Sequence, residues 1–207
     1  MNQEENSAGS AHWACRAVTR LSSALLAVER LAIMGFMFLL TGLILLNVVT
    51  RYTGVPLYWV DESAVYAVVW LTFIGASAMT RLRLDFSVTM LTDRFSKRGM
   101  QVAKVMSTAM VVLFALALMG MCVLWMDPVG LARAGFDARE FAGQTFNFLY
   151  TERTQTLNWP FWVLYQIMPI FAISMVIHGV ANILEDLELV PRVAHAGFVL
   201  AEVDGVN

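Results

Sequence analysis

Four long apolar segments constrain this chain more than any other feature of its sequence. They cover residues 31–50, 63–80, 105–126 and 161–184. The hydrocarbon core of a bilayer is about 30 Å thick, and a helix needs about 20 apolar residues to cross it. The segments lack the period-two alternation of membrane β-strands and are about twice as long as such strands. The sequence therefore predicts an all-α integral membrane protein with four transmembrane helices.

The composition supports a lipid environment and excludes several functions. Hydrophobic residues make up 58% of the 207 residues and charged residues only 14%, unlike an average soluble domain. A net charge of −2 offers no basic surface, so we expect no nucleic acid partner. Cys15 and Cys122 form neither a disulfide framework nor a metal-binding pair. No catalytic, metal or cofactor motif is present in the sequence, so we expect no enzyme activity and no cofactor.

The N-terminal arm, residues 1–30, has an amphipathic pattern. Its apolar residues recur at helical spacing, and its basic and hydroxyl residues fall off that stripe. The stripe consists of Trp13, Ala17, Leu21, Leu25 and Val28, and the polar side of Arg16, Arg20 and Ser23. The pattern predicts an amphipathic helix lying in the membrane interface. A simple helical extension of the first span fits it equally well.

Basic residues near the ends of the spans predict the orientation in the membrane. One side carries Arg16, Arg20, Arg30, Arg81, Arg83, Arg94, Lys97, Arg98 and Lys104. The other side carries Arg51, Arg133, Arg139 and Arg153. We therefore expect the N-terminus, the middle loop and the tail, residues 186–207, to be cytoplasmic. The connection, residues 127–160, then faces outward, which is the periplasm in a Gram-negative cell, and its pattern predicts a short surface helix.

The fourth span carries a polar stripe, because Gln166, Ser174, His178 and Asn182 lie on one i, i+4 progression. His178 could be a proton or ligand site. Interhelical hydrogen bonding, at about 0.6–2 kcal/mol per contact, is the interpretation we favour. Haem ligation is less compatible, since the sequence offers no second intramembrane histidine.

Small residues predict close helix packing, because apolar attraction contributes little to helix association inside lipid. Candidate packing positions in the first three spans are Gly35, Gly42, Gly75, Ala76 and Gly120. They could serve the chain's own bundle or docking onto another membrane protein, and we expect both.

Two adjacent carboxylates, Asp61 and Glu62, precede the second span in the run "YWVDESAVYAVVW". Acidic side chains at a helix start interact favourably with the macrodipole, by about 0.3–1 kcal/mol. We expect one of them to cap the helix. The other is a candidate contact with a basic group on a partner subunit.

Two stretches carry a resemblance to a known family. The first is "RYTGVPLYWVDESAVYAVVWLTFIGASAMTRLRLDFSVTMLTDRF", whose matching residues are Arg51, Tyr52, Pro56, Trp59, Asp61, Glu62, Trp70, Gly75, Ala76 and Arg81. The second is "TLNWPFWVLYQIMPI", with Pro160, Trp162 and Pro169. Together they resemble the DctQ-like small membrane subunit of tripartite ATP-independent periplasmic (TRAP) transporters, over roughly residues 25–185.

The chain departs from the family pattern at two places. Residues 85–89 read Asp-Phe-Ser-Val-Thr where the family commonly has a His-hydrophobic-x-Val-Asp signature, and the outward connection is longer than usual. The first departure puts a histidine role there in doubt, and the second suggests an enlarged periplasmic surface.

The resemblance implies a non-catalytic subunit in the bacterial cell inner membrane. Its expected partners are a DctM-like large TRAP membrane subunit, which carries the substrate and sodium ions, and a DctP-like periplasmic solute-binding protein. The small subunit would brace the large one and help the binding protein dock during ion-coupled uptake of an organic acid. Two alternatives are a membrane anchor of a redox complex and a small self-sufficient channel or exporter.

Overall fold

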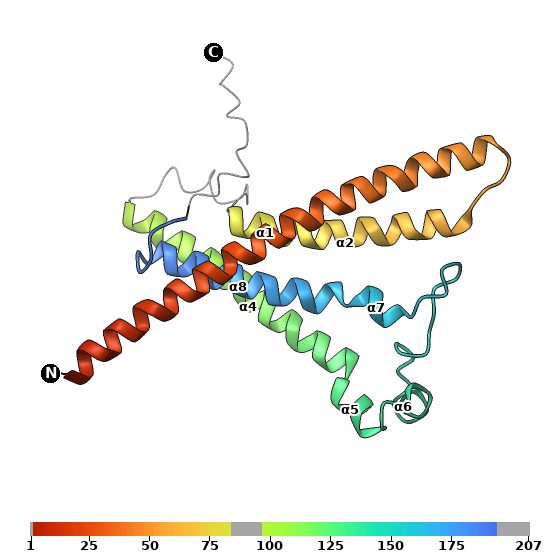
Figure 1. Cartoon of the computed structure of the whole chain (residues 1–207). Coiled ribbons are helices and arrows are strands. Elements are labelled where there is room, and N and C mark those ends of the chain that lie inside the picture. The colour runs from red at the N-terminus through yellow and green to blue at the C-terminus, as the bar shows by residue number, and fades with distance from the viewer. Residues whose placement is uncertain (1, 84–96, 194–207) are drawn as a thin grey trace, which may run out of the picture.

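The computed structural model describes residues 2–83 and 97–193, and the described chain is helical without a β-strand (Figure 1). Its helices are α1 (Asn2–Tyr52), α2 (Tyr58–Leu82), α4 (Lys97–Met126), α5 (Pro128–Arg133), α6 (Ala138–Thr145), α7 (Phe161–Tyr165) and α8 (Ile167–Asp186). Four helical stretches are long and apolar enough to cross a membrane: Trp13–Tyr52, Tyr58–Leu82, Arg98–Arg133 and Phe161–Asp186. The prediction of an all-α protein with four spans is confirmed.

The N-terminal arm is continuous with the first span, because α1 runs without a break from Asn2 to Tyr52. The alternative of a helical extension is therefore the one found, and a separate amphipathic helix is wrong. The predicted apolar stripe faces away from the protein, since Trp13, Leu21 and Val28 are exposed. The opposite side, which includes Ser22 and Glu29, is buried against the other helices. The polar side is buried because hydrogen bonds join Ser22 to α8 and Glu29 to α2 and α8.

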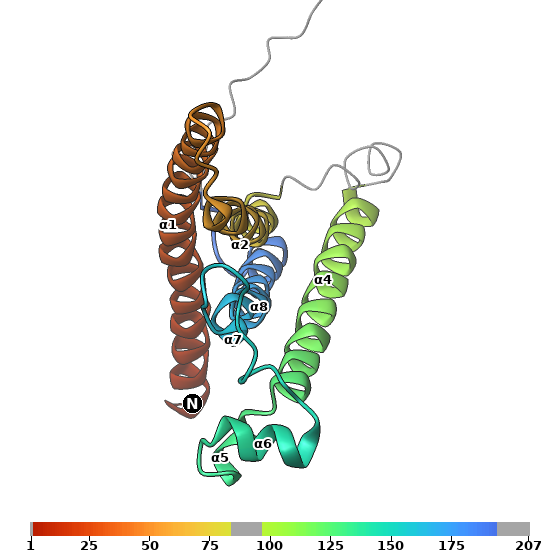
Figure 2. The same cartoon turned by 90° about the vertical axis from the view of Figure 1, so that its right-hand side faces the viewer.

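The helix α8 is the centre of the bundle. It packs against α1, α2 and α4, whereas α4 packs chiefly against α8. The helices α1 and α2 form an antiparallel arm through their shared turn, and Figure 2 shows α8 between this arm and α4. The arm and α4 separate toward the end that carries α5 and α6 (Figure 1). Packing between helices is therefore densest at the opposite end, where α1, α2 and α8 meet.

The fourth span is interrupted between α7 and α8. Pro169 has no N–H to donate to the carbonyl group of Tyr165, four residues earlier, which is the last residue of α7. The backbone N–H of Ile170 donates to the carbonyl of Gln166 at 3.1 Å and so continues the chain into α8. The missing N–H of Pro169 therefore explains why the span divides into α7 and α8.

The connection, residues 127–160, contains two short helices rather than the one expected. The Asp127 carboxylate accepts from the backbone N–H of Gly130 at 2.8 Å, which caps α5. The Asp137 carboxylate caps α6 in the same way, and the N–H groups of Glu140 and Arg139 hold the pKa of Asp137 below its usual value. The α6 side chain Phe141 is buried beside Tyr150, with ring centroids 5.7 Å apart. The connection is thus an ordered structure with its own packing.

Candidate functional site

Two charged layers mark the ends of the membrane-spanning bundle. Asp61 pairs with Arg51 at 2.7 Å at one end of α2, and Arg81 pairs with Glu185 at 2.5 Å at the other. At about 1.5 Å per helical residue, Asp61 and Arg81 lie about 30 Å apart along α2. This separation equals the thickness of the hydrocarbon core. We call the Asp61 end the outer end and the Arg81 end the inner end.

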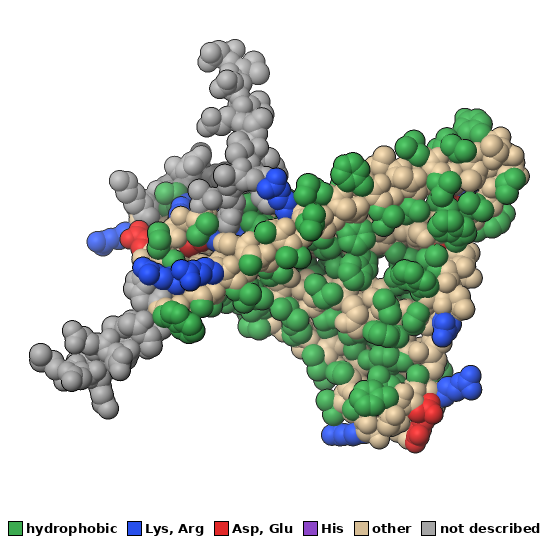
Figure 3. Space-filling view, in the orientation of Figure 1, with side chains coloured by type: hydrophobic (Ala, Val, Ile, Leu, Met, Phe, Trp, Pro, Cys, Tyr) green, Lys and Arg blue, Asp and Glu red, His purple; other side chains and the backbone are tan. Residues whose placement is uncertain are grey.

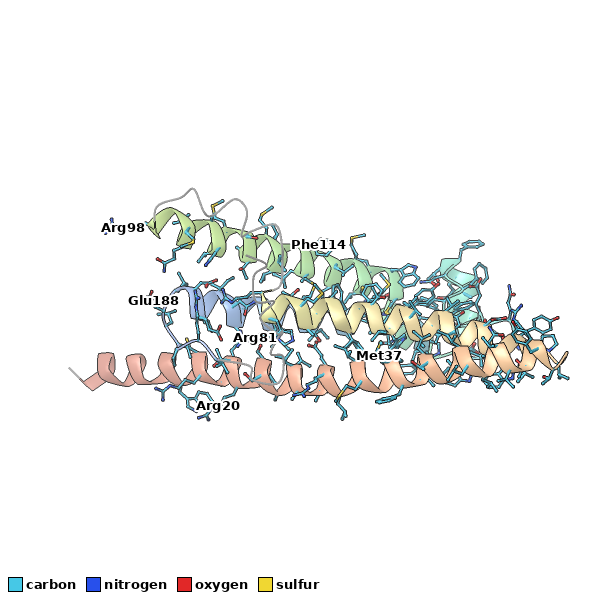
Figure 4. All side chains as sticks on the ribbon, turned by 90° about the horizontal axis from the view of Figure 1, so that it is seen from above. Arg20, Met37, Arg81, Arg98, Phe114 and Glu188 are labelled. Atoms are coloured by element: carbon cyan, nitrogen blue, oxygen red, sulfur yellow. The ribbon has the colours of Figure 1, made fainter. Side chains whose placement is uncertain are left out.

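Buried polar side chains gather at the inner end, and we call this group the inner polar cluster. Its members are Ser22, Glu29, Ser77, Arg81, His178, Asn182, Glu185 and Asp186. They come from α1, α2 and α8, which far-separated parts of the sequence bring together. Figure 4 shows Arg81 directed into the bundle and Arg20 directed away from it. Sequence reasoning found His178 and Asn182 as part of a polar stripe. It did not identify the other α8 members, Glu185 and Asp186, and did not place Ser22, Glu29 or Ser77 with the stripe.

His178 is the junction of the three helices. Its side chain is fully buried, with Nδ1 2.7 Å from the Ser22 hydroxyl and Nε2 3.0 Å from a carboxylate oxygen of Glu29. The other Glu29 oxygen accepts from the Ser77 hydroxyl on α2 at 2.7 Å. Both ring nitrogens are therefore occupied by α1, so a metal or haem would have to displace Ser22 or Glu29. The arrangement is interhelical hydrogen bonding.

Arg81 connects α2 to α8 and is not a loop residue. It lies in the last turn of α2, and only 2% of its surface is exposed. Its guanidinium donates to the Asn182 side-chain oxygen at 2.6 Å and to Glu185 at 2.5 Å. The Asn182 amide in turn donates to the Thr80 carbonyl at 2.8 Å. The sequence used Arg81 only as one of the basic residues that predict the orientation, whereas in the structure the carboxylate of Glu185 on α8 binds it inside the bundle.

A second arginine extends the cluster to the bundle surface. Arg83 donates to Asp186 at 2.6 Å and lies 3.5 Å from the second oxygen of Glu185. Asp186 also accepts from Arg192 at 3.0 Å. Glu185 and Asp186 therefore each have an arginine partner, whereas the buried carboxylate of Glu29 is held by His178 and Ser77.

Some predicted residues lie outside the inner polar cluster, and others lie outside the residues that the structure describes. Ser174 is buried on α8, and Gln166 lies at the joint between α7 and α8. Arg98 is exposed at the start of α4. Arg94 and the departure from the family pattern at residues 85–89 lie outside the described residues.

The acidic pair does not cap α2. The helix begins three residues before Asp61, and its N-cap, Leu57, has no side-chain capping bond. Asp61 instead accepts from Asn47 and Arg51 on α1. The Arg51 guanidinium also donates to the Asn47 side-chain oxygen at 2.9 Å. The cap prediction is wrong because Asp61 lies in the first turn of the helix, after the N-cap position, and its carboxylate faces α1.

Glu62 holds the connection against α2. Its carboxylate accepts from the backbone N–H groups of Gln155, Thr156 and Leu157 at 3.0, 2.8 and 3.0 Å, and from the Thr156 hydroxyl. Three converging N–H groups make a site for a carboxylate, and this chain supplies the carboxylate itself. A contact between Glu62 and another subunit stays a prediction.

The predicted small residues do not pack helices within this chain. A Cβ added to Gly35, Gly42, Gly75 or Gly120 would meet no atom within 4 Å, and Ala76 is exposed. The close helix approach occurs instead at Gly179, where an added Cβ would lie 2.4 Å from the Val112 side chain of α4. The sequence contains no signal that separates Gly179 from the other glycines, since close approach depends on the crossing partner.

The comparisons with known proteins agree with this architecture. The family model for the DctQ component of tripartite ATP-independent periplasmic transporters matches residues 40–189. No curated protein and no solved structure matches the chain. The family match includes the described parts of α2, α4 and α8 and the outer part of α1, and four helices suit a multi-pass membrane protein. The chain therefore belongs to the DctQ component family and is a small membrane subunit of a TRAP transporter.

Proposed function

We propose that this subunit is a non-catalytic scaffold that braces a DctM-like large membrane subunit in the bacterial inner membrane. It also helps a DctP-like solute-binding protein dock during ion-coupled uptake of an organic acid. The inner polar cluster faces the cytoplasm together with both termini, and the connection faces the periplasm. The excess of basic residues near the inner end supports this orientation.

The pairing of the buried charges is the observation that carries the scaffold role. A transport pathway needs polar or ionisable groups that a solute or ion can reach. In the described helices, the buried ionisable groups of the inner polar cluster bind one another across α1, α2 and α8. Such pairing links the three helices, and among the buried side-chain atoms of the described residues Arg81 Nε and Asp186 Oδ2 are those without a hydrogen-bond partner. Transport therefore belongs to the large subunit.

The open glycines support contact with the large subunit. Gly35 and Gly42 lie on the same side of α1, and both have free space around an added Cβ. Phe38 and Leu45 are exposed on this side as well. Figure 3 shows hydrophobic side chains over much of the visible face of the bundle. Small residues on such a surface favour close backbone approach by a partner helix.

Exposed aromatic side chains on the connection support the docking role. Phe136 and Phe146 are 75% and 81% exposed, and Trp159 is 54% exposed. Aromatic residues are enriched in protein interfaces. The hydrogen bonds that the Glu62 carboxylate accepts hold residues 155–157 of the connection in place. Part of this surface is therefore ordered before any partner binds.

Purification from native membranes in gentle detergent tests the proposal. Mass spectrometry of the co-purifying proteins should identify a much larger multispan subunit. A haem protein or flavoprotein partner would support the redox anchor instead, and a lone homo-oligomer would support a channel or exporter.

Replacing Phe136 and Phe146 together by serine then tests docking, since both side chains are exposed on the connection. We expect solute uptake to fall while membrane insertion and co-purification persist. Unchanged uptake would contradict the docking role.

A further inference from the structure

An apolar groove runs between the α1–α2 arm and the end of the connection near α7. Its cavity volume is about 510 Å³, within the range of small-molecule sites. Its walls include Phe36 and Leu39 of α1, Trp59, Ala67 and Trp70 of α2, and Val163 of α7. In Figure 3 an opening is visible between the arm and the segment beside it, bordered by hydrophobic side chains. Neither the family match nor the scaffold role explains this space.

The groove has the depth of one bilayer leaflet. Along α2 it extends from Trp59, beside the outer charged layer, to Trp70, a rise of about 16 Å. Half of the hydrocarbon core is about 15 Å. The inner floor is closed, because the Trp70 indole N–H donates to the Leu164 carbonyl at 3.1 Å and its ring lies 6.0 Å from Phe36. The groove therefore begins at the outer membrane interface and ends near the bilayer midplane.

The length of the groove decides which occupant fits. A transmembrane helix of a partner crosses the whole hydrocarbon core of about 30 Å, whereas the groove ends at its closed inner floor after about 16 Å. The acyl chains of one leaflet also end near the bilayer midplane. A partner helix can therefore cover the groove but does not match its length.

The chemistry of the two ends agrees with a phospholipid. The inner part offers aromatic and aliphatic side chains, which suit a hydrocarbon chain. The outer end lies beside Trp59 and Ser63, close in sequence to the Asp61–Arg51 pair, where polar headgroups lie in a bilayer. We propose that this groove binds one acyl chain of a phospholipid from the outer-end leaflet. The lipid fills the space between the arm and α7 and links them as part of the assembled subunit.

A photo-crosslinking experiment tests this proposal on the full chain with its co-purifying partners. Benzoylphenylalanine is placed at position 39, which lines the groove, or at position 44, which lies on α1 outside it and away from the side of Gly35 and Gly42. Leu39 and Ile44 are 50% and 51% exposed, so the two positions are matched. The protein is reconstituted in phosphatidylethanolamine and phosphatidylglycerol, then washed extensively in detergent and illuminated. We expect a phospholipid adduct at position 39 and at least about tenfold less at position 44.

Two tryptophan variants provide an independent measurement. Leu39→Trp fills the groove, and Ile44→Trp adds a side chain of the same size outside it. Native mass spectrometry should find one retained phospholipid in the unmodified chain and in Ile44→Trp, and none in Leu39→Trp. Equal retention in both variants, no retention in the unmodified chain, or a polypeptide as the main adduct at position 39 would overturn the proposal. None of these results decides the scaffold role, which the co-purification experiment tests separately.

Discussion

Replacing Arg81 by methionine should destabilise the bundle more than any surface change. Methionine keeps the length and apolar stem of the arginine and removes the guanidinium. Glu185 then remains buried, since only 4% of its surface is exposed. It keeps a distant partner, because the Arg83 guanidinium lies 3.5 Å from its second oxygen. The Asn182 side-chain oxygen also loses its donor.

The expected loss follows from that geometry. Removing one partner of a buried ion pair costs about 3–5 kcal/mol, because the remaining charge stays out of water. The remaining contact with Arg83 offsets part of this cost, so we expect the free energy of unfolding to fall by about 3 kcal/mol. Typical total stabilities are about 5–15 kcal/mol, so the change is a large fraction. The double variant Arg81→Met with Glu185→Leu should recover most of the loss, since it leaves no unpaired carboxylate at this position.

The assay is denaturant unfolding in mixed micelles, followed by circular dichroism. Arg20→Met is the matched control, because Arg20 is exposed on α1 and its replacement should change stability by no more than about 0.5 kcal/mol. A loss in Arg81→Met no greater than that in Arg20→Met would refute the reasoning. So would a double variant less stable than the single one, since the cost would then not come from the unpaired carboxylate.

Three further predictions concern the connection, the glycines and the orientation. Glu62→Gln should speed amide hydrogen exchange at residues 155–157, because a neutral amide is a weaker acceptor than a carboxylate; unchanged exchange would contradict the anchoring role. Gly179→Ala should lower stability in micelles by about 1–3 kcal/mol through overpacking, and Gly42→Ala should not; equal effects would exclude a specific close approach at Gly179. Arg98→Cys should resist an impermeant thiol reagent in intact cells, and rapid labelling from outside would reverse the proposed orientation.

The membrane character and the family could be predicted from the sequence. Long apolar segments determine spans by length and hydropathy, independently of how the helices later meet. The aromatic and acidic residues around Trp59 and the proline pattern around Pro169 were sufficient to suggest the DctQ family, which the match over residues 40–189 confirms. The boundaries were less accurate, since α1 and α2 begin before the apolar segments do. Polar residues at helix ends do not interrupt a helix.

The pairing of polar residues was decided by the tertiary structure alone. The sequence places His178 on a polar stripe, but Ser22 and Glu29 become its partners only where α1 crosses α8, about 150 residues away. Asp61 and Glu62 are adjacent in the sequence, yet one binds α1 and the other binds the connection. Local periodicity predicts that a residue lies on a helix and on which face. A hydrogen bond also requires the distance and direction of its partner, and these depend on how the helices cross.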